Sequence, residues 1–201
     1  MTSDRVLYLP GAEGEGRFWQ PVADLVAHAG ENVLFDWPGF GSNPPRDGLT
    51  SADDLYRLVQ DYIDRPVDLV AQSMGGLFAL RASLEHPDLV RRLVLVATSG
   101  GVRAVRDLAQ ADWRPEFVET YPQAPSWVVL DQTDYTPRLA ELTMPVLLLW
   151  GDADPISPPA AGQLLQTLLP NATLEVIAGG DHAFGRDRAE EVAPIIRRFL
   201  A

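Results

Sequence analysis

Six short runs of apolar residues recur along the chain, and each run is nearly continuous rather than alternating with polar residues. A strand whose two faces are both covered carries apolar residues at successive positions, so this pattern predicts the strands of a parallel sheet. The predicted strands occupy residues 5–10, 32–38, 67–72, 92–98, 145–151 and 173–178.

Between these runs, apolar positions recur at the three- to four-residue spacing of an amphipathic helix. The second helical segment begins with Thr50 or Ser51, and either residue suits a helix N-cap. Pro194 interrupts the last helical pattern, so we expect a kink or a later start there. The predicted helices occupy residues 18–30, 50–64, 75–87, 157–170 and 188–200.

The alternation of strands and helices predicts right-handed crossovers and a sheet between two layers of helices. The alternation is interrupted over about residues 100–143, which contain prolines and aromatic residues but no strong strand pattern. We expect this segment to form a small helical cap, inserted into a single domain that covers residues 1–201. The predicted fold class is therefore α/β, a three-layer sandwich.

Composition narrows the classes of partner. The 201 residues are 46% hydrophobic and 22% charged, which suits one globular domain. The net charge of −12 repels phosphate backbones and anionic lipid, so we expect neither nucleic acid nor a membrane as partner. The chain has no cysteine, and its three histidines do not match a zinc-binding spacing, so no metal is expected.

The first residues carry no signal-peptide pattern and no apolar run is long enough to span a bilayer, which indicates a cytoplasmic protein. The oligomeric state is not predicted.

A serine follows the third predicted strand, in the stretch VDLVAQSMGG at residues 67–76. Ligands of α/β sheets bind beyond the carboxyl ends of the strands, so Ser73 lies where chemistry is expected. Ala71 and Gly75 are small, as a sharp strand-to-helix turn requires. These residues alone fit either a helix N-cap or a nucleophile, because a serine hydroxyl attacks well only when a neighbouring base accepts its proton.

A base and an acid are expected at the same edge of the sheet. His182 follows the sixth predicted strand, whereas the other two histidines lie at the ends of predicted helices. Asp152 and Asp154 both follow the fifth strand, and either carboxylate could orient the imidazole. A serine, a histidine and a carboxylate at one sheet edge favour a catalytic triad in which Ser73 is the nucleophile.

The same stretches resemble motifs of the α/β-hydrolase superfamily. AQSMGG is similar to its nucleophile elbow, GDADPISPP to the loop that carries its acid, and GGDHAF to the loop that carries its base. The chain order of serine, acid and histidine is also that of the superfamily. The resemblance covers residues 5–99 and 137–201 and implies that Ser73, Asp154 and His182 are the catalytic residues.

The stretch YLPGAEGEGRFW resembles the first-strand loop of the superfamily and implies an oxyanion hole formed by the backbone N–H groups of Ala12 and Met74. Pro10 stands where the superfamily often has histidine, which affects the conformation of this loop rather than the donor. Ala71 replaces the first glycine of the elbow, a change of one methyl group. Only four residues precede the first predicted strand, so we expect a reduced, mostly parallel sheet of about six strands.

The resemblance implies a serine hydrolase that needs no cofactor. Its expected substrate is a small to medium carboxylic ester, or a thioester, cleaved through an acyl-enzyme intermediate. A C–C bond hydrolase, a cofactor-free haloperoxidase, a menaquinone-pathway-like lyase and a non-turnover ligand-binding receptor are alternatives on the same triad. The candidates for lining the substrate pocket are Trp19, Trp113, Trp127 and Phe184.

Overall fold

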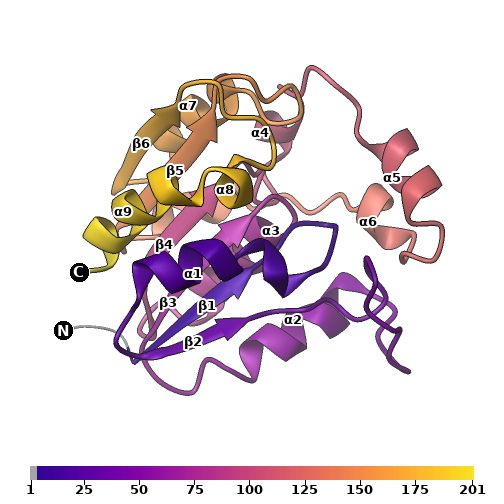
Figure 1. The fold of residues 1–201 in the computed structure, drawn as a ribbon, viewed down its shortest axis with the longest axis horizontal. Helices are drawn as coiled ribbons and strands as arrows, with labels where there is room; N and C mark the ends of the chain where they lie inside the picture. The colour runs from indigo at the N-terminus through magenta and orange to yellow at the C-terminus, as the bar shows by residue number, and fades with distance from the viewer. Residues whose placement is uncertain (1–3) are drawn as a thin grey trace.

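The computed structural model describes residues 4–201, and in that range six strands form one sheet in which every neighbouring pair is parallel. The strand order is β2-β1-β3-β4-β5-β6 (Figure 1). The strands are β1 (Arg5–Leu9), β2 (Glu31–Leu34), β3 (Val67–Gln72), β4 (Val90–Val96), β5 (Val146–Gly151) and β6 (Ala172–Ile177). The predicted parallel sheet of about six strands is confirmed. The expected single domain begins at residue 1, and residues 1–3 lie outside the described range.

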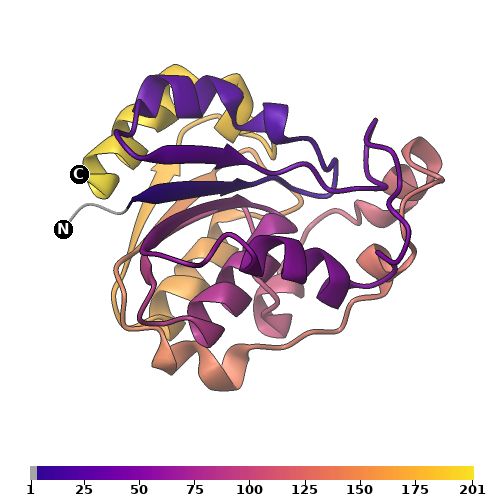
Figure 2. The same cartoon turned by 90° about the horizontal axis from the view of Figure 1, so that it is seen from below.

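Helices cover both faces of the sheet, as Figure 2 shows. One layer contains α1, α8 and α9, and the other contains α2, α3 and α7. These helices are α1 (Gln20–Val26), preceded by the 3-10 helix η1 (Gly16–Phe18), α2 (Ala52–Gln60), α3 (Gly75–Glu85), α7 (Pro159–Leu168), α8 (Phe184–Asp187) and α9 (Ala189–Leu200). The predicted three-layer α/β arrangement is therefore confirmed. Within residues 4–201, no helix has the length and apolar character needed to cross a membrane.

The central strand β3 shows why the apolar runs are continuous. Leu69 and Ala71 point into the core beneath α2, α3 and α7, whereas Val70 points into the core beneath α1 and α9. All six residues of β3 are buried, because helices cover both faces of the strand. Burying one such valine or leucine side chain contributes about 1.5–3 kcal/mol, so the two cores fix which face of each strand points to which layer.

Two helix predictions can be compared with the structure. Ser51 is the N-cap of α2, and it forms a capping box with Asp54, whose carboxylate accepts a hydrogen bond from the Ser51 N–H at 3.0 Å. The helix α9 begins at Ala189, so it does not start late at Pro194 but continues through it. Proline removes one backbone donor from the helix, and the strongly amphipathic remainder keeps packing on the sheet.

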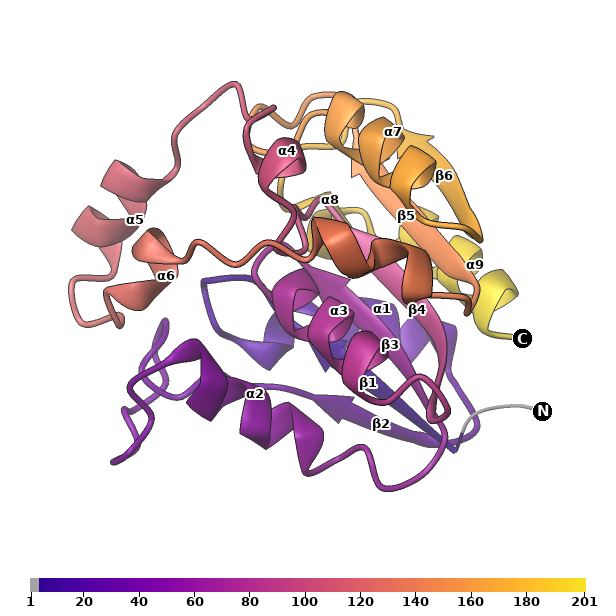
Figure 3. The same ribbon diagram turned by 180° about the vertical axis from the view of Figure 1, so that it is seen from behind.

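Residues 100–143, all of which the structure describes, form short helices and no strand. These elements are α4 (Arg103–Arg106), α5 (Arg114–Thr120), α6 (Trp127–Leu130) and the 3-10 helix η2 (Thr136–Glu141). α5 and α6 lie beyond the carboxyl ends of the strands (Figures 1 and 3). The Gln123 Nε2 group donates to the Gly41 carbonyl at 3.0 Å, which joins this segment to the loop that follows β2. That the segment acts as a cap stays a prediction.

Candidate active site

Ser73 lies in the sharp turn between β3 and α3. Its φ of 49° is in the left-handed region, where a residue with a side chain is strained. The turn is held by a hydrogen bond from the Ser73 N–H to the Val96 carbonyl (3.0 Å) and by two donors to the Ser73 carbonyl. These donors are the Thr98 hydroxyl (2.5 Å) and the Gly76 N–H (3.0 Å). The sequence analysis did not identify Thr98 as a residue that holds this turn. Its position just beyond the end of β4, which pairs with β3, could have indicated that it lies near Ser73.

The turn also requires a close backbone approach at Gly75. A Cβ atom there would overlap the Leu9 carbonyl oxygen at the end of β1. The missing side chain therefore lets the first turn of α3 lie directly against the loop that follows β1.

We expect Gly75→Ala to lower the free energy of unfolding by about 1–3 kcal/mol, because backbone must move to admit the methyl group. Urea denaturation followed by circular dichroism measures the change. Gly185→Ala is the matched control, since a Cβ there meets its nearest neighbours at an ordinary 3.4 Å. Equal stability of the Gly75→Ala and Gly185→Ala proteins would contradict this account of the turn.

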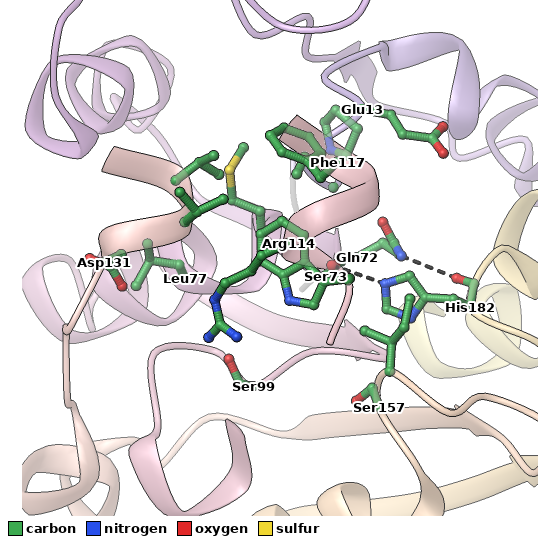
Figure 4. Close-up of a pocket in the computed structure, with 18 of the residues that line it drawn as sticks. Glu13, Gln72, Ser73, Leu77, Ser99, Arg114, Phe117, Asp131, Ser157 and His182 are labelled. Carbon is green, nitrogen blue, oxygen red and sulfur yellow. Dashed lines mark hydrogen bonds between the residues drawn. The ribbon is translucent and has the colours of Figure 1, made fainter. Parts of the chain in front are cut away.

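The three predicted triad side chains come together at the carboxyl edge of the sheet. His182 Nε2 lies 3.1 Å from Ser73 Oγ, and His182 Nδ1 lies 2.7 Å from Asp154 Oδ2. Figure 4 shows the first of these contacts at the edge of a cavity. A carboxylate only accepts hydrogen bonds, so Nδ1 carries the ring proton and Nε2 is left to accept from the Ser73 hydroxyl. This arrangement can move the hydroxyl proton onto the imidazole.

The structure distinguishes the two candidate acids. The Asp154 side chain is fully buried, and its Oδ1 accepts from the N–H groups of Ile156 (2.8 Å) and Ser157 (3.0 Å). Its second oxygen remains for His182, so one carboxylate both caps its own loop and faces the imidazole. Asp152 instead accepts from the Gly179 N–H at 2.5 Å, which links the loop after β5 to the loop after β6.

Ala12 and Met74 carry the backbone N–H groups that were expected to form an oxyanion hole. Both residues line the cavity beside Ser73. Within residues 4–201, neither N–H donates to a protein acceptor. Met74 also precedes the first turn of α3, so its N–H belongs to a helix N-terminus, which favours negative charge. Both donors are therefore free of protein acceptors, and that they bind an anionic oxygen stays a prediction.

Two buried indoles hold the loop that carries Ala12. The Trp37 Nε1 group donates to the Pro10 carbonyl at 3.0 Å, and the Trp19 Nε1 group donates to the Leu9 carbonyl at 3.0 Å. The loop is thus anchored on both sides of the proline that departs from the family motif. Trp19 was expected in the pocket wall, but it is fully buried, because its N–H is used to anchor β1 from the α1 side.

A cavity of about 410 Å³ opens over Ser73, between the sheet edge and the helices of residues 100–143 (Figure 4). Trp113 and Trp127 line it, whereas Trp19 does not. Phe184 does not line it either, since this side chain is fully buried at the start of α8 and packs in the core beneath α1 and α9. The larger apolar side chains in the wall include those of Phe18, Met74, Leu77, Val105, Trp113, Phe117, Trp127 and Ile156.

Two side chains in the cavity wall, Tyr121 and Glu15, have shifted pKa values. Burial raises the pKa of the Tyr121 hydroxyl, and the nearby Glu13 and Glu15 raise it further, so Tyr121 stays neutral. The Ser42 hydroxyl donates to Glu15 at 2.7 Å and lowers the pKa of its carboxyl group, which therefore stays ionised. In the described part of the chain, His, Asp and Glu side chains form no group of three that could hold a metal ion.

Comparisons with known proteins give the wider family. Poly(3-hydroxyalkanoate) depolymerase of Ectopseudomonas oleovorans is 30% identical over 85% of this chain and 75% of its own length. Polyketide synthase ThaQ of Burkholderia thailandensis is 28% identical over 98% of this chain, but the chain spans only 12% of that protein. A solved structure of a thermophilic esterase from Thermogutta terrifontis superposes with a TM-score of 0.75 at 20% identity, over 99% of this chain and 90% of the esterase.

The family assignment follows from a match that covers nearly the whole chain. The sequence model of the Alpha/beta hydrolase family matches residues 6–195, a range that includes Ser73, Asp154 and His182. The six-stranded parallel sheet and the superposition on the esterase agree with this match. The chain therefore belongs to the alpha/beta hydrolase family.

Proposed function

We propose that this protein is a serine hydrolase that cleaves a carboxylic ester through an acyl-enzyme intermediate. The observation that carries the proposal is the pair of hydrogen bonds that joins Asp154, His182 and Ser73 beneath an open cavity. A serine beside a base that is itself oriented by a carboxylate is the arrangement of an activated nucleophile.

Each group has a defined part in the proposed reaction. Ser73 Oγ attacks the ester carbonyl carbon while His182 Nε2 takes the hydroxyl proton, and the carbonyl oxygen becomes an anion between the N–H groups of Ala12 and Met74. When the C–O bond to the alcohol breaks, His182 returns the proton to the leaving oxygen. A water molecule then attacks the acyl-enzyme with His182 as base, which releases the acid and restores Ser73. Asp154 stabilises the imidazolium in both halves of the reaction.

The size and lining of the cavity support a small to medium acyl group. About 410 Å³ lies within the range of pockets for small molecules, and about half of the lining residues are aromatic or aliphatic. Apolar chain length should therefore raise affinity until the cavity is filled. The alternatives on the same triad are thioester hydrolysis, C–C bond hydrolysis, cofactor-free haloperoxidation, a menaquinone-pathway-like lyase reaction and ligand binding without turnover. No contact in the cavity favours one of them over ester hydrolysis.

A panel of p-nitrophenyl esters tests the proposal. We expect kcat/KM to rise from acetate to butyrate or octanoate and then to fall steeply at palmitate, because the longest chain exceeds the cavity. Release of p-nitrophenolate measures each rate. One alternative, a receptor that binds its ligand without turnover, predicts a different result. Folded protein that hydrolyses no ester above the buffer rate, yet gains thermal stability with a ligand, would identify a receptor and refute the proposal.

A further inference from the structure

The buried Gln72 side chain lies between the loop that carries His182 and the loop that carries Gly11 and Ala12. Gln72 is the last residue of β3 and directly precedes Ser73. Side chains alternate along a strand, so Gln72 shares the sheet face of Val70, which α1 and α9 cover. α8 packs on the same face and begins two residues after His182. The Gln72 amide is therefore directed toward the loop that carries the base.

The contacts of this amide join two loops. Gln72 Nε2 donates to the carbonyl oxygen of His182 at 3.2 Å (Figure 4), and within residues 4–201 no backbone N–H donates to that oxygen. On its other side, the Gln72 Oε1 atom lies so close to Gly11 that a Cβ atom there would overlap it. Only 4% of Gln72 is exposed, so solvent competes little for these contacts.

The loop that carries His182 needs such an anchor. Two glycines, Gly179 and Gly180, precede it, and Gly179 has a φ of 71°, which glycine adopts more readily than other residues. The Gly179 N–H donates to Asp152 and the Gly180 carbonyl accepts from the Ala153 N–H, so these two bonds hold the loop before the histidine but not at it. His182 Nε2 must nevertheless stay at hydrogen-bond distance from Ser73 Oγ, where a misplacement of about 1 Å can cost about 100-fold in rate. A hydrogen bond to the backbone of His182 itself restrains the position of the ring.

We infer that Gln72 is a positioning residue for His182. Its amide holds the backbone of the base at a fixed distance from the neighbouring nucleophile, because its hydrogen bond goes to His182 rather than into the cavity that Gln72 also lines. This inference rests on the proposed function, because it assigns Gln72 a part in the chemistry of the same triad.

Two substitutions of equal length test the inference. Gln72→Met removes the donor and keeps the volume, so we expect kcat to fall about tenfold, as for loss of one hydrogen bond that acts on the transition state, with KM within about twofold. Gln72→Glu places a carboxylate against the His182 carbonyl oxygen, and we expect a larger fall. The rate at which a fluorophosphonate labels Ser73 should fall in parallel, because labelling needs the same base. A merely structural role would not lower that rate in folded protein.

Asn171→Leu is the matched control. It also removes a bond from a side-chain amide to a backbone carbonyl, here between the exposed Asn171 and Thr143 (2.6 Å), just before β6 and thus at the amino end of the strands. We expect it to lower the melting temperature and leave kcat unchanged. Folded Gln72→Met protein with the kcat of the wild type, or an equal fall of kcat in Asn171→Leu, would overturn the inference. The proposed function fails separately, if the wild type hydrolyses no ester.

Discussion

Replacing Ser73 with alanine should lower kcat toward p-nitrophenyl butyrate by about 10⁴–10⁶-fold, the range expected when the nucleophile of a triad is removed. The substitution deletes only Oγ. Alanine keeps the same strained φ of 49°, and the hydrogen bonds of the turn use the backbone of residue 73, so the elbow should persist. Steady-state kinetics, with circular dichroism as the test of folding, measure the loss.

Covalent labelling extends this prediction to the atom that attacks. A fluorophosphonate should add one phosphonyl group to the wild type and none to Ser73→Ala, as intact mass spectrometry would show. Ser126→Ala is the matched control, since this serine is exposed at the start of α6 and does not line the cavity. It should keep both labelling and kcat. Full esterase activity of Ser73→Ala would remove Ser73 from the mechanism.

The sequence could predict where the site lies, because parallel strands end at one edge. Ser73 follows β3, Asp154 follows β5 and His182 follows β6. Because the carboxyl ends of these parallel strands lie at one edge of the sheet, a nucleophile, an acid and a base that follow them are expected to lie close together. Side-chain periodicity could also place the strands, since burial on both faces leaves a continuous apolar run. These inferences depend only on backbone topology, which a pattern of residue types specifies well.

The sequence could not predict how individual side chains point. Trp19 and Phe184 are as aromatic as Trp113 and Trp127, but only the second pair lines the cavity. The difference comes from neighbours distant in sequence: Trp19 reaches the Leu9 carbonyl, and Phe184 enters the core beneath α9. The role of Gln72 was likewise missed, because its partner is the backbone carbonyl of a residue 110 positions away. Every residue has a backbone carbonyl, so the sequence does not indicate which one a side chain will contact.

The buried Asp154 gives a second large effect with an unusually clear cause. We expect Asp154→Asn to lower kcat by about 10⁴-fold. The N–H groups of Ile156 and Ser157 both point at Oδ1 and require an oxygen there, so the introduced amide must turn its NH₂ group toward His182. The imidazole then accepts at Nδ1 and carries its proton on Nε2. In that tautomer it cannot take the proton of Ser73, although every heavy atom stays in place.

The matched control for this substitution is Asp152→Asn, two residues earlier in the same loop. Asp152 accepts a bond from the Gly179 N–H and makes no contact with the imidazole, so the amide oxygen can replace the carboxylate with little change in kcat. Melting temperature separates a tautomer effect from loss of fold, because Asp154→Asn keeps both of its backbone hydrogen bonds and should remain folded. If the two variants lost activity equally, the loss would reflect the loop after β5 rather than the tautomer of His182. A loss confined to Asp154→Asn ties the carboxylate to the protonation of the base, and through it to the attack by Ser73.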